Sequence, residues 1–546
     1  MPDKLDLIIG KPDIKKEKNE GVATYTRFVL PFAFQLQAAP EITKPPELYY
    51  KLNDKTDISY IKRRKYFTRE TASTLYERGQ WLSTCDEWKT TPWGKAEIAI
   101  TLRGQEFKIG MLPPQIVLFE VPEIKHQKQA DILQTGFLSV DIYFSKEQKV
   151  QPQLDDLLIL NEFLRYFGIP YDDHAEKLKE YFSNIPVTLN GKETIGSLTN
   201  SLHCYFERWS SMLEIPLKDK NNNYYQLFSK EWNTAAKAWM YNEKNSNKAD
   251  HWQIYADNRC YVWTVAFLNN GGKKLKQVFE PGTYELNAKD YGHWIKLLNI
   301  DPPSFDINKN LSQIETHKSV SQFERQWADQ RTYKRWEHNG TWYGFCYHGA
   351  AILAPPEAYI FLPSVSYYFD TAILLFYIRM TLFRFGRELS QVIEIETETK
   401  KRKKLRTLRR QFSNFTILYR FPLPSNQQQS IEMYELNRNF LDLDQFFEEI
   451  QQEIDNTHEF LETIESTDLA KAANKLANWG IPLAAGGLIT ALFSMSDFNL
   501  WQCSTSFSDS QCSINVDIIL QTIIVFMMSL GTFLGLKIYD KFKKNK

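Results

Sequence analysis

Short apolar runs recur through the first part of the chain, and one of them, Ala96–Leu102, alternates between apolar and polar residues with a period of two. Residues 1–150 contain short apolar runs separated by Gly and Pro, a pattern typical of β-strands joined by turns. These runs are Thr26–Gln37, Ala96–Leu102, Phe107–Met111, Gln115–Val121 and Phe137–Phe144. Residues 1–150 are therefore expected to form a β-rich region.

The hydrophobic period changes after this region. Asp155–Phe167 starts with acidic residues and continues with helical apolar spacing, and further helices are expected at Asp172–Phe182 and Ile195–Leu213. Tyr261–Leu268 again has the composition of a strand. Residues 151–303 are therefore expected to be mixed α/β, with a domain boundary in the polar stretch Ser304–Ser319.

The next region, residues 320–430, joins a polar-aromatic segment to a long apolar helix. Tyr367–Phe385 has helical apolar spacing, but it also contains Asp370, Arg379 and Arg384. Charged residues are costly inside a bilayer. This stretch is therefore expected to be a buried helix of the body rather than a membrane span.

Apolar residues in steps of three and four predict a long stalk helix over residues 431–475. The seam consists of Met433, Leu436, Phe440, Leu443, Phe447, Ile450, Ile454, Thr457, Leu461 and Ile464. Such a heptad seam favours helix pairing. No proline interrupts Ile431–Ile481, and Ser466–Asp468 is the candidate break. The partner would be either the helix Tyr367–Arg410 of the same chain or copies of the stalk in an oligomer.

Two stretches near the end of the sequence have no charged side chain. Leu476–Ser496 and Ile518–Leu536 each have the length, about 20 residues, that spans a ~30 Å hydrocarbon core. Only a helix satisfies its own backbone polar groups in lipid, so both are expected to be transmembrane helices. The alternative is a buried helical hairpin of a soluble core.

The flanking charges predict the topology. Lysines precede the first span and follow the second, in residues 537–546, whereas the loop of residues 497–517 has no Lys or Arg. The positive-inside rule then places both termini in the cytoplasm and the loop outside the plasma membrane. Met1–Lys18 lacks the apolar core of a secretory signal. Cys503 and Cys512 both lie in the loop, where an oxidising compartment permits either a disulfide or two free thiols.

Two basic and aromatic stretches could bind an anionic ligand. One is Tyr60–Phe67, for which a solvated charged turn is the alternative, and the other is Gln322–His348. The second could instead be a helix and a hairpin, turning at His338–Thr341, whose aromatic residues fill a core. The ligand-binding candidates are Arg63, Arg64, Arg331, Arg335, Trp336, Tyr343 and His348.

Composition and motifs give no sign of catalysis. The 546 residues contain 66 Lys and Arg against 66 Asp and Glu, which does not suggest a nucleic-acid-binding protein. HExxH, GxSxG and Rossmann glycine motifs are absent, and none of the nine histidines pairs at metal-ligand spacing. We therefore expect neither an enzyme nor a cofactor. The expected fold is an α+β cytoplasmic body, a long α-helical stalk and a C-terminal two-helix transmembrane hairpin.

This arrangement resembles the CorA-type metal-ion transporter superfamily. The resemblance covers Tyr367–Lys546 in architecture and implies a homo-oligomer, with five subunits in that family, whose first span lines a cation pore. By that resemblance the pore-lining candidates are Thr490, Ser494, Met495 and Asn499. The family signature Gly-Met-Asn is replaced by Ser494-Met495-Ser496, so the permeating ion and any metal site are not assigned.

A divergent pore below an enlarged body is similar to the CorA-like membrane effectors of type III CRISPR and related antiviral systems. That resemblance implies gating by a nucleotide second messenger bound to the cytoplasmic body. Two other functions are consistent with the sequence. One is a divalent metal-ion transporter with a drifted signature, and the other is a membrane-tethered binding or scaffold protein without a pore.

Overall fold

The structure is a computed structural model of the full chain. It describes residues 5–13, 19–34, 37–38, 50–52, 58–84, 97–102, 105–112, 115–119, 134–165, 187–189, 193–195, 217–218, 224–226, 252–254, 260–269, 288–301, 321–420, 423–495, 501–503 and 512–514, together with positions 523, 527 and 531. Two compact units divide the chain, Met1–Ile454 and Asp455–Lys546.

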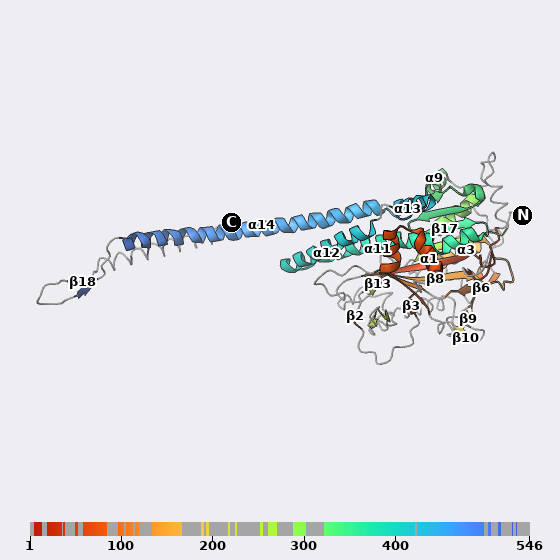
Figure 1. Ribbon diagram of the computed structural model, residues 1–546, viewed down its shortest axis with the longest axis horizontal. Coiled ribbons are helices and arrows are strands. Elements are labelled where there is room, and N and C mark those ends of the chain that lie inside the picture. Colours follow the sequence, from red (N-terminus) through yellow and green to blue (C-terminus); the bar gives the residue numbers. More distant parts are fainter. Residues whose placement is uncertain are drawn as a thin grey trace, which may run out of the picture. The chain divides into compact units, whose positions relative to one another are not determined.

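A mixed sheet is the centre of the first unit (Figure 1). Its main path runs β15-β16-β17-β14-β1-β8-β7-β4-β3, and β6 and β13 pair with β8 and β1. The pairing of β14 with β17 is parallel and the other pairings are antiparallel. The strands are β1 (Tyr25–Phe34), β3 (Tyr50–Leu52), β4 (Gly79–Thr84), β5 (Glu97–Leu102), β6 (Gln105–Met111), β7 (Gln115–Phe119), β8 (Gln134–Phe144), β13 (Trp252–Ile254), β14 (Tyr261–Phe267), β15 (Thr332–Tyr333), β16 (Trp342–Cys346) and β17 (Gly349–Ala354).

The sheet joins strands from the three regions that the sequence separates. The strands expected in residues 1–150 are confirmed, as is the strand at Tyr261–Phe267. Every residue of β14 and of β17 is buried, as expected for strands that are covered on both faces. The first unit is thus an α+β unit in which one mixed sheet contains strands from all three regions of the sequence.

Helices cover both faces of this sheet. In β14, Trp263 contacts Phe369 with ring centroids 5.7 Å apart, whereas the next residue, Thr264, accepts a hydrogen bond from Asn161 at 2.9 Å. Successive strand residues point to opposite faces. Phe369 belongs to α11 (Tyr367–Ile393) and Asn161 to α3 (Leu154–Leu164), so these two helices lie on opposite sides.

Shorter helices complete the cover of the sheet. They are α1 (Ile58–Tyr66), α2 (Arg69–Ser73), the π-helix η1 (Thr74–Arg78), α8 (Ala288–Asn299), α9 (Gln322–Arg331) and α10 (Ala358–Val365). α9 has a capping box, because Ser321 accepts from the Glu324 backbone and the Glu324 carboxylate accepts from the Ser321 backbone. The turn at Gly340 has φ of 70°, and it joins β15 to β16 as the sequence predicts.

Helix α11 is buried in the body. Ala358–Ile393, which comprises α10 and α11, is long and apolar enough to cross a membrane, but 72% of its most apolar part is buried. Tyr377 stacks on Phe119 of the sheet, with ring centroids 4.2 Å apart. This burial agrees with the expectation of a core helix.

Helix α12 (Glu398–Tyr419) runs antiparallel to α11 (Figure 1). Tyr377 near the start of α11 contacts Tyr419 at the end of α12, and Phe385 further along contacts Phe412. The turn at residues 394–397 separates them, where the sequence suggests one helix through Arg410.

The expected stalk helix is interrupted. It consists of α13 (Gln428–Phe440) and α14 (Leu443–Met495), and no break occurs at Ser466–Asp468. Asp442, between the two helices, has φ of 52°, which a helix cannot continue. The prediction of one long helix from Ile431, with Ser466–Asp468 as its only possible break, was therefore wrong. Phe447 of α14 packs on Phe412 and Phe415, so the early seam finds its partner within the same chain.

The second unit contains most of α14. A strand pair of β18 (Trp501–Cys503) and β19 (Cys512–Ile514) follows it. The predicted first membrane span is helical through Met495. The predicted second span lies outside the described residues except for three helical positions, Ile523, Met527 and Gly531, so no transmembrane hairpin is observed. Two short sheets of the first unit complete the fold: β9 (Val187–Leu189) with β10 (Glu193–Ile195), and β2 (Gln37–Ala38) with β12 (Tyr224–Gln226) and β11 (Leu217–Lys218).

Three predicted features lie outside the described residues. These are the helices expected at Asp172–Phe182 and Ile195–Leu213 and the domain boundary at Ser304–Ser319. By contrast, Tyr60–Phe67 is described, and it is not a charged turn. It lies mostly in α1, where Tyr66 and Phe67 are buried and Arg63 is part-buried.

Candidate functional site

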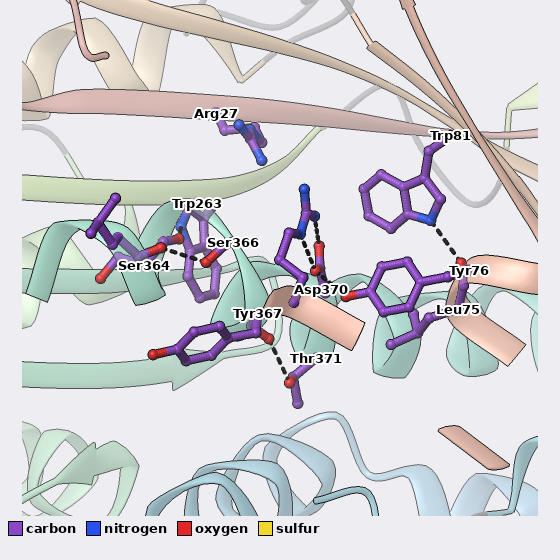
Figure 2. A network of polar contacts seen from close by, with 12 residues as sticks. Arg27, Leu75, Tyr76, Trp81, Trp263, Ser364, Ser366, Tyr367, Asp370 and Thr371 are labelled. Atoms are coloured by element: carbon purple, nitrogen blue, oxygen red, sulfur yellow. Dashed lines mark hydrogen bonds and ion pairs between the residues drawn. The ribbon is translucent and has the colours of Figure 1, made fainter. Parts of the chain in front are cut away.

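Arg63, a predicted ligand-binding residue, makes a bidentate ion pair with Asp370 at the start of α11 (Figure 2). The Arg63 Nε donates to Asp370 Oδ2 at 2.8 Å, and the second contact joins the terminal nitrogen to Oδ1. The Tyr76 hydroxyl donates to the same Oδ2 at 2.5 Å. The Asp370 side chain is fully buried. Charge-assisted bidentate contacts of this kind are strong and directional, so Arg63 fastens α1 to α11.

Electrostatics agree with a structural role for this network. Burial, the largest single effect, lowers the pKa of Arg63, but the charges and hydrogen bonds of Asp370 and Tyr76 together outweigh it and raise the pKa. Burial, followed by the Asp370 charge, raises the pKa of Tyr76 well above its usual value. Both groups therefore keep their protonated forms at neutral pH. Arg64 points to the surface instead, where it pairs with the half-exposed Glu77.

Around the network, backbone contacts hold the start of α11 against the sheet. The Trp263 indole donates to the Ser364 carbonyl at 3.1 Å, and the Trp81 indole donates to the Leu75 carbonyl at 2.7 Å. Figure 2 shows these two indoles on either side of Asp370. The Thr371 hydroxyl donates to the Tyr367 carbonyl at 2.8 Å.

A tyrosine cluster continues from α1 to the β15–β16 hairpin. Tyr66 stacks on Tyr367 with ring centroids 3.8 Å apart, and Tyr368 meets Tyr343 edge-on at 5.6 Å. Tyr343 in turn contacts Tyr333 at 6.3 Å. Burial raises the pKa of Tyr343 well above its usual value. Tyr343, a predicted ligand contact, is therefore a neutral core residue.

The predicted candidate Arg335, which follows β15 in the sequence, contacts a residue in the first turns of α13. Its guanidinium lies 3.0 Å from both carboxylate oxygens of Glu432, and the Tyr333 hydroxyl donates to the same carboxylate. The hydrogen bond from Tyr333, together with those from Gln428 and Arg335, lowers the pKa of Glu432. The Trp336 ring centroid lies 5.8 Å from the Arg335 guanidinium. This group ties the hairpin to the first turns of α13.

The predicted candidate Arg331 is the last residue of α9, and its side chain packs against the other end of α13. Its guanidinium is 4.4 Å from the ring centroids of both Trp327 and Phe440, and it donates to the Trp327 carbonyl at 3.1 Å. His348 is exposed in the turn between β16 and β17. Its ring meets that of Tyr347 at 5.3 Å, and its carbonyl accepts from Val262.

The sequence candidates therefore do not share one pocket, and two of them are exposed: Arg64 on α1 and His348 in the turn between β16 and β17. Arg63 and Tyr343 belong to buried packing, Arg335 and Trp336 lie at the first end of α13, and Arg331 lies at its second end. Helix α13 connects the last two places and leads into α14. The candidate functional site is therefore the face formed by the β15–β16 hairpin and α13, together with Arg331, which packs near the joint between α13 and α14.

Sequence reasoning missed the partners of these arginines. Asp370 was singled out only as an obstacle to membrane insertion, and Glu432 carried no signal of its own. A charge inside an apolar helix needs a buried partner. That rule would have directed attention from Asp370 and Arg379 to basic and aromatic residues elsewhere in the sequence, although not to the particular partners.

The pore candidates are described only as far as the backbone. Thr490, Ser494 and Met495 belong to α14, and residues 490 and 494 are four apart, so they share one face of the helix. Asn499 lies outside the described residues. In β18 and β19, Cys503 and Cys512 are direct partners in the antiparallel register. Within the described ranges, no group of three or more His, Cys, Asp or Glu side chains could hold a metal ion.

Comparisons with known proteins assign no family to this chain. No protein-family model, no curated protein and no solved structure matches it. The resemblance to CorA-type transporters therefore stays a prediction from the arrangement of residues 367–546.

Proposed function

We propose that this chain is the subunit of an oligomeric membrane channel, with a cytoplasmic body that senses a ligand. The observation that carries the proposal is helix α14. It begins at Leu443 against α11 and α12, and it continues for 53 residues to Met495. Its last part, from Leu476, has no charged residue. About 20 such residues suit the hydrocarbon core of a bilayer.

Apolar side chains on α14 support assembly. Phe460, Leu469 and Leu476 are 65%, 64% and 74% exposed in the single chain. Leu469 and Leu476 are seven residues apart and share one face of α14, whereas Phe460 lies on the opposite face, so partners or lipid would cover the helix on two sides. Helices of neighbouring subunits would cover Phe460 and Leu469, and lipid or neighbouring spans would cover Leu476.

The route from ligand to pore would pass through α13. This helix is held by Glu432 at its first end and by Phe440 at its second end, and it is followed directly by α14. A ligand shifts a two-state equilibrium only by its different affinity for the two states. A ligand that contacts the hairpin or α13 in one state more than in the other would therefore bias α14.

Subunit number tests this proposal. We would measure the mass of the full chain in detergent beside a truncation that ends at Lys475. A stable oligomer of five subunits for the full chain is the expected result. Monomers or dimers in both samples would exclude a CorA-like pore and favour a membrane-tethered binding protein.

A further inference from the structure

Arg379 of α11 is a buried cation with no carboxylate partner in the described part of the chain. It is 2% exposed, and one terminal nitrogen donates to the Tyr347 carbonyl at 3.0 Å. The guanidinium lies 3.1 Å from the Tyr347 ring centroid and 5.5 Å from that of Phe383. Its Nε is buried and has no hydrogen-bond partner. Among the described residues, no carboxylate lies within ion-pair distance of Arg379.

The body treats its other buried arginines differently. Arg27, Arg165 and Arg384 lie 2.5, 2.8 and 3.4 Å from a carboxylate oxygen. For Arg379, burial lowers the pKa to about 10, and more distant charges, Asp442 first, only partly oppose this. Arginine keeps its charge at neutral pH even so. A charge buried without a partner is strongly unfavourable, so Arg379 is suited to an anion that comes from outside the chain.

A second arginine lies in electrostatic range of the same groups. Burial lowers the pKa of Arg331, and Cys346 and Asp442, which also act on Arg379, oppose that shift. Arg331 donates one hydrogen bond, to the Trp327 carbonyl, and its guanidinium packs against two aromatic rings. Tyr347, whose ring covers the Arg379 guanidinium, is itself 44% exposed. Arg331 packs on Phe440, and Arg379 lies beside Phe383, whose ring contacts that of Phe446, so the two guanidinium groups flank the stretch of chain that contains Asp442.

Asp442 is the carboxylate whose charge acts on both arginines. It is exposed, and it forms the joint between α13 and α14 with a left-handed φ of 52°. A side chain other than glycine adopts this conformation at a cost, and such positions recur at switch regions. The joint thus depends on a strained residue that is attracted to two arginines but not bonded to either.

We propose that Arg331 and Arg379 form a binding site for a phosphate-type oxyanion, and that the bound anion displaces Asp442 from their field and resets the joint between α13 and α14. Guanidinium groups bind phosphate oxygens through paired N–H donors. A doubly charged anion would neutralise both arginines, which Asp442 alone does not. Binding of an anion by the two arginines does not require a pore, whereas the effect on α14 rests on the proposed channel function.

Binding is tested on the full chain in detergent by calorimetric titration in chloride buffer. Orthophosphate and ATP serve as separate probes, since they distinguish a free phosphate site from one for a phosphorylated nucleoside. Arg379→Met and Arg331→Gln are each expected to weaken binding of the effective probe about tenfold or more, because each removes a charge-assisted contact. Arg387→Gln, at an exposed arginine of α11 about two turns after Arg379, is the matched control and should bind as the unmodified chain does.

The chosen substitutions separate a loss of binding from a loss of folding. Arg379→Met replaces an unpaired buried charge by an apolar chain of similar length and is expected to fold, and Arg331→Gln tests the site independently. Asp442→Asn removes the competing charge, keeps a residue that tolerates a left-handed backbone, and should tighten binding several-fold. Unchanged affinity in both arginine variants, or no binding of either probe, would overturn the proposal.

Hydrogen exchange at the joint tests whether the bound anion resets the connection between α13 and α14. The Phe446 amide donates to the Asp442 carbonyl at 3.0 Å, and the Asp442 amide donates to the Asn439 carbonyl at 3.1 Å. A saturating probe should change the exchange of these amides in the unmodified chain and leave Arg379→Met unchanged. Binding without a change at the joint would refute the coupling. A pentamer that binds neither probe would refute this site alone, whereas a monomer that binds would refute only the channel.

Discussion

Arg63 and Asp370 meet in a bidentate ion pair although 307 residues separate them in the sequence. The pair joins a short N-terminal helix to the first turn of the central helix α11. Tyr76 adds a third element through its hydrogen bond to the same carboxylate. An aspartate inside an apolar helix thereby becomes the point at which α11 is fixed to two neighbouring elements of the N-terminal region, α1 and η1.

Removing one partner of this pair should destabilise the body. Asp370→Leu leaves the Arg63 guanidinium without its counter-charge, which costs about 3 kcal/mol when a buried pair is broken. We expect the apparent melting temperature to fall by several degrees, measured by the near-ultraviolet circular dichroism of the full chain.

The double variant Arg63→Met with Asp370→Leu is the control. It replaces both charges by apolar groups and should recover much of the loss, because the cost lies in the unpaired charge. A double variant no more stable than Asp370→Leu alone would show that packing, not charge, sets the effect.

The anchor of α13 should depend on pH. The hydrogen bond from Tyr333 lowers the folded-state pKa of Glu432 below its ordinary value of 4.5. The stabilisation is therefore complete above the unfolded-state pKa and is lost as the pH falls through the folded-state value. The difference in melting temperature between the unmodified chain and Glu432→Gln should be largest near neutral pH and vanish in acid. A difference that grows as the pH falls would contradict this assignment.

Gly344 of β16 should tolerate no side chain. A Cβ at this position would lie 2.7 Å from the Trp294 ring and 2.8 Å from Leu298 of α8. Overpacking of this kind costs roughly 1–3 kcal/mol. Gly344→Ala should lower the melting temperature, whereas Gly386→Ala, whose Cβ would meet only the end of Ile450 at 3.1 Å, should change it much less. Equal effects would show that α8 yields to the strand.

Cys503 and Cys512 should be joined by a disulfide in the protein taken from membranes. Direct partners in an antiparallel pair have Cα atoms about 4.5–5.5 Å apart, within the range that a disulfide spans. We expect both thiols to resist alkylation until a reductant is added, as measured by mass spectrometry of the loop peptide. Immediate alkylation of both would mean that the loop does not face an oxidising compartment.

Local patterns predicted much of the fold. The strands around Phe28, Ile109 and Val140, and the helices that contain Leu158 and Ile373, follow the apolar periods of their own segments. These elements are fixed by residues that are neighbours in the sequence, because alternating or helical spacing decides which face is buried.

Features set by distant contacts could not be predicted. Residues 58–66 form a helix because Arg63 and Tyr66 meet α11, and the joint at Asp442 has a backbone conformation that its own residue type does not favour. The parallel pairing of Val262 with Gly349 also joins segments far apart. For the candidate site, the arginines were visible in the sequence, but the lack of a carboxylate beside Arg379 was not.

Electrical recording tests the central claim most directly. The full chain would be reconstituted into a planar bilayer, in salt solution on both sides, and its current recorded at a fixed voltage. The account predicts discrete conductance steps whose open fraction changes when orthophosphate or ATP is added on the side that the body faces. A truncation ending at Lys475 should give none. A full chain that inserts as an oligomer and leaves the bilayer silent under all these conditions would contradict the channel proposal, and steady conductance that no probe alters would favour a plain cation transporter.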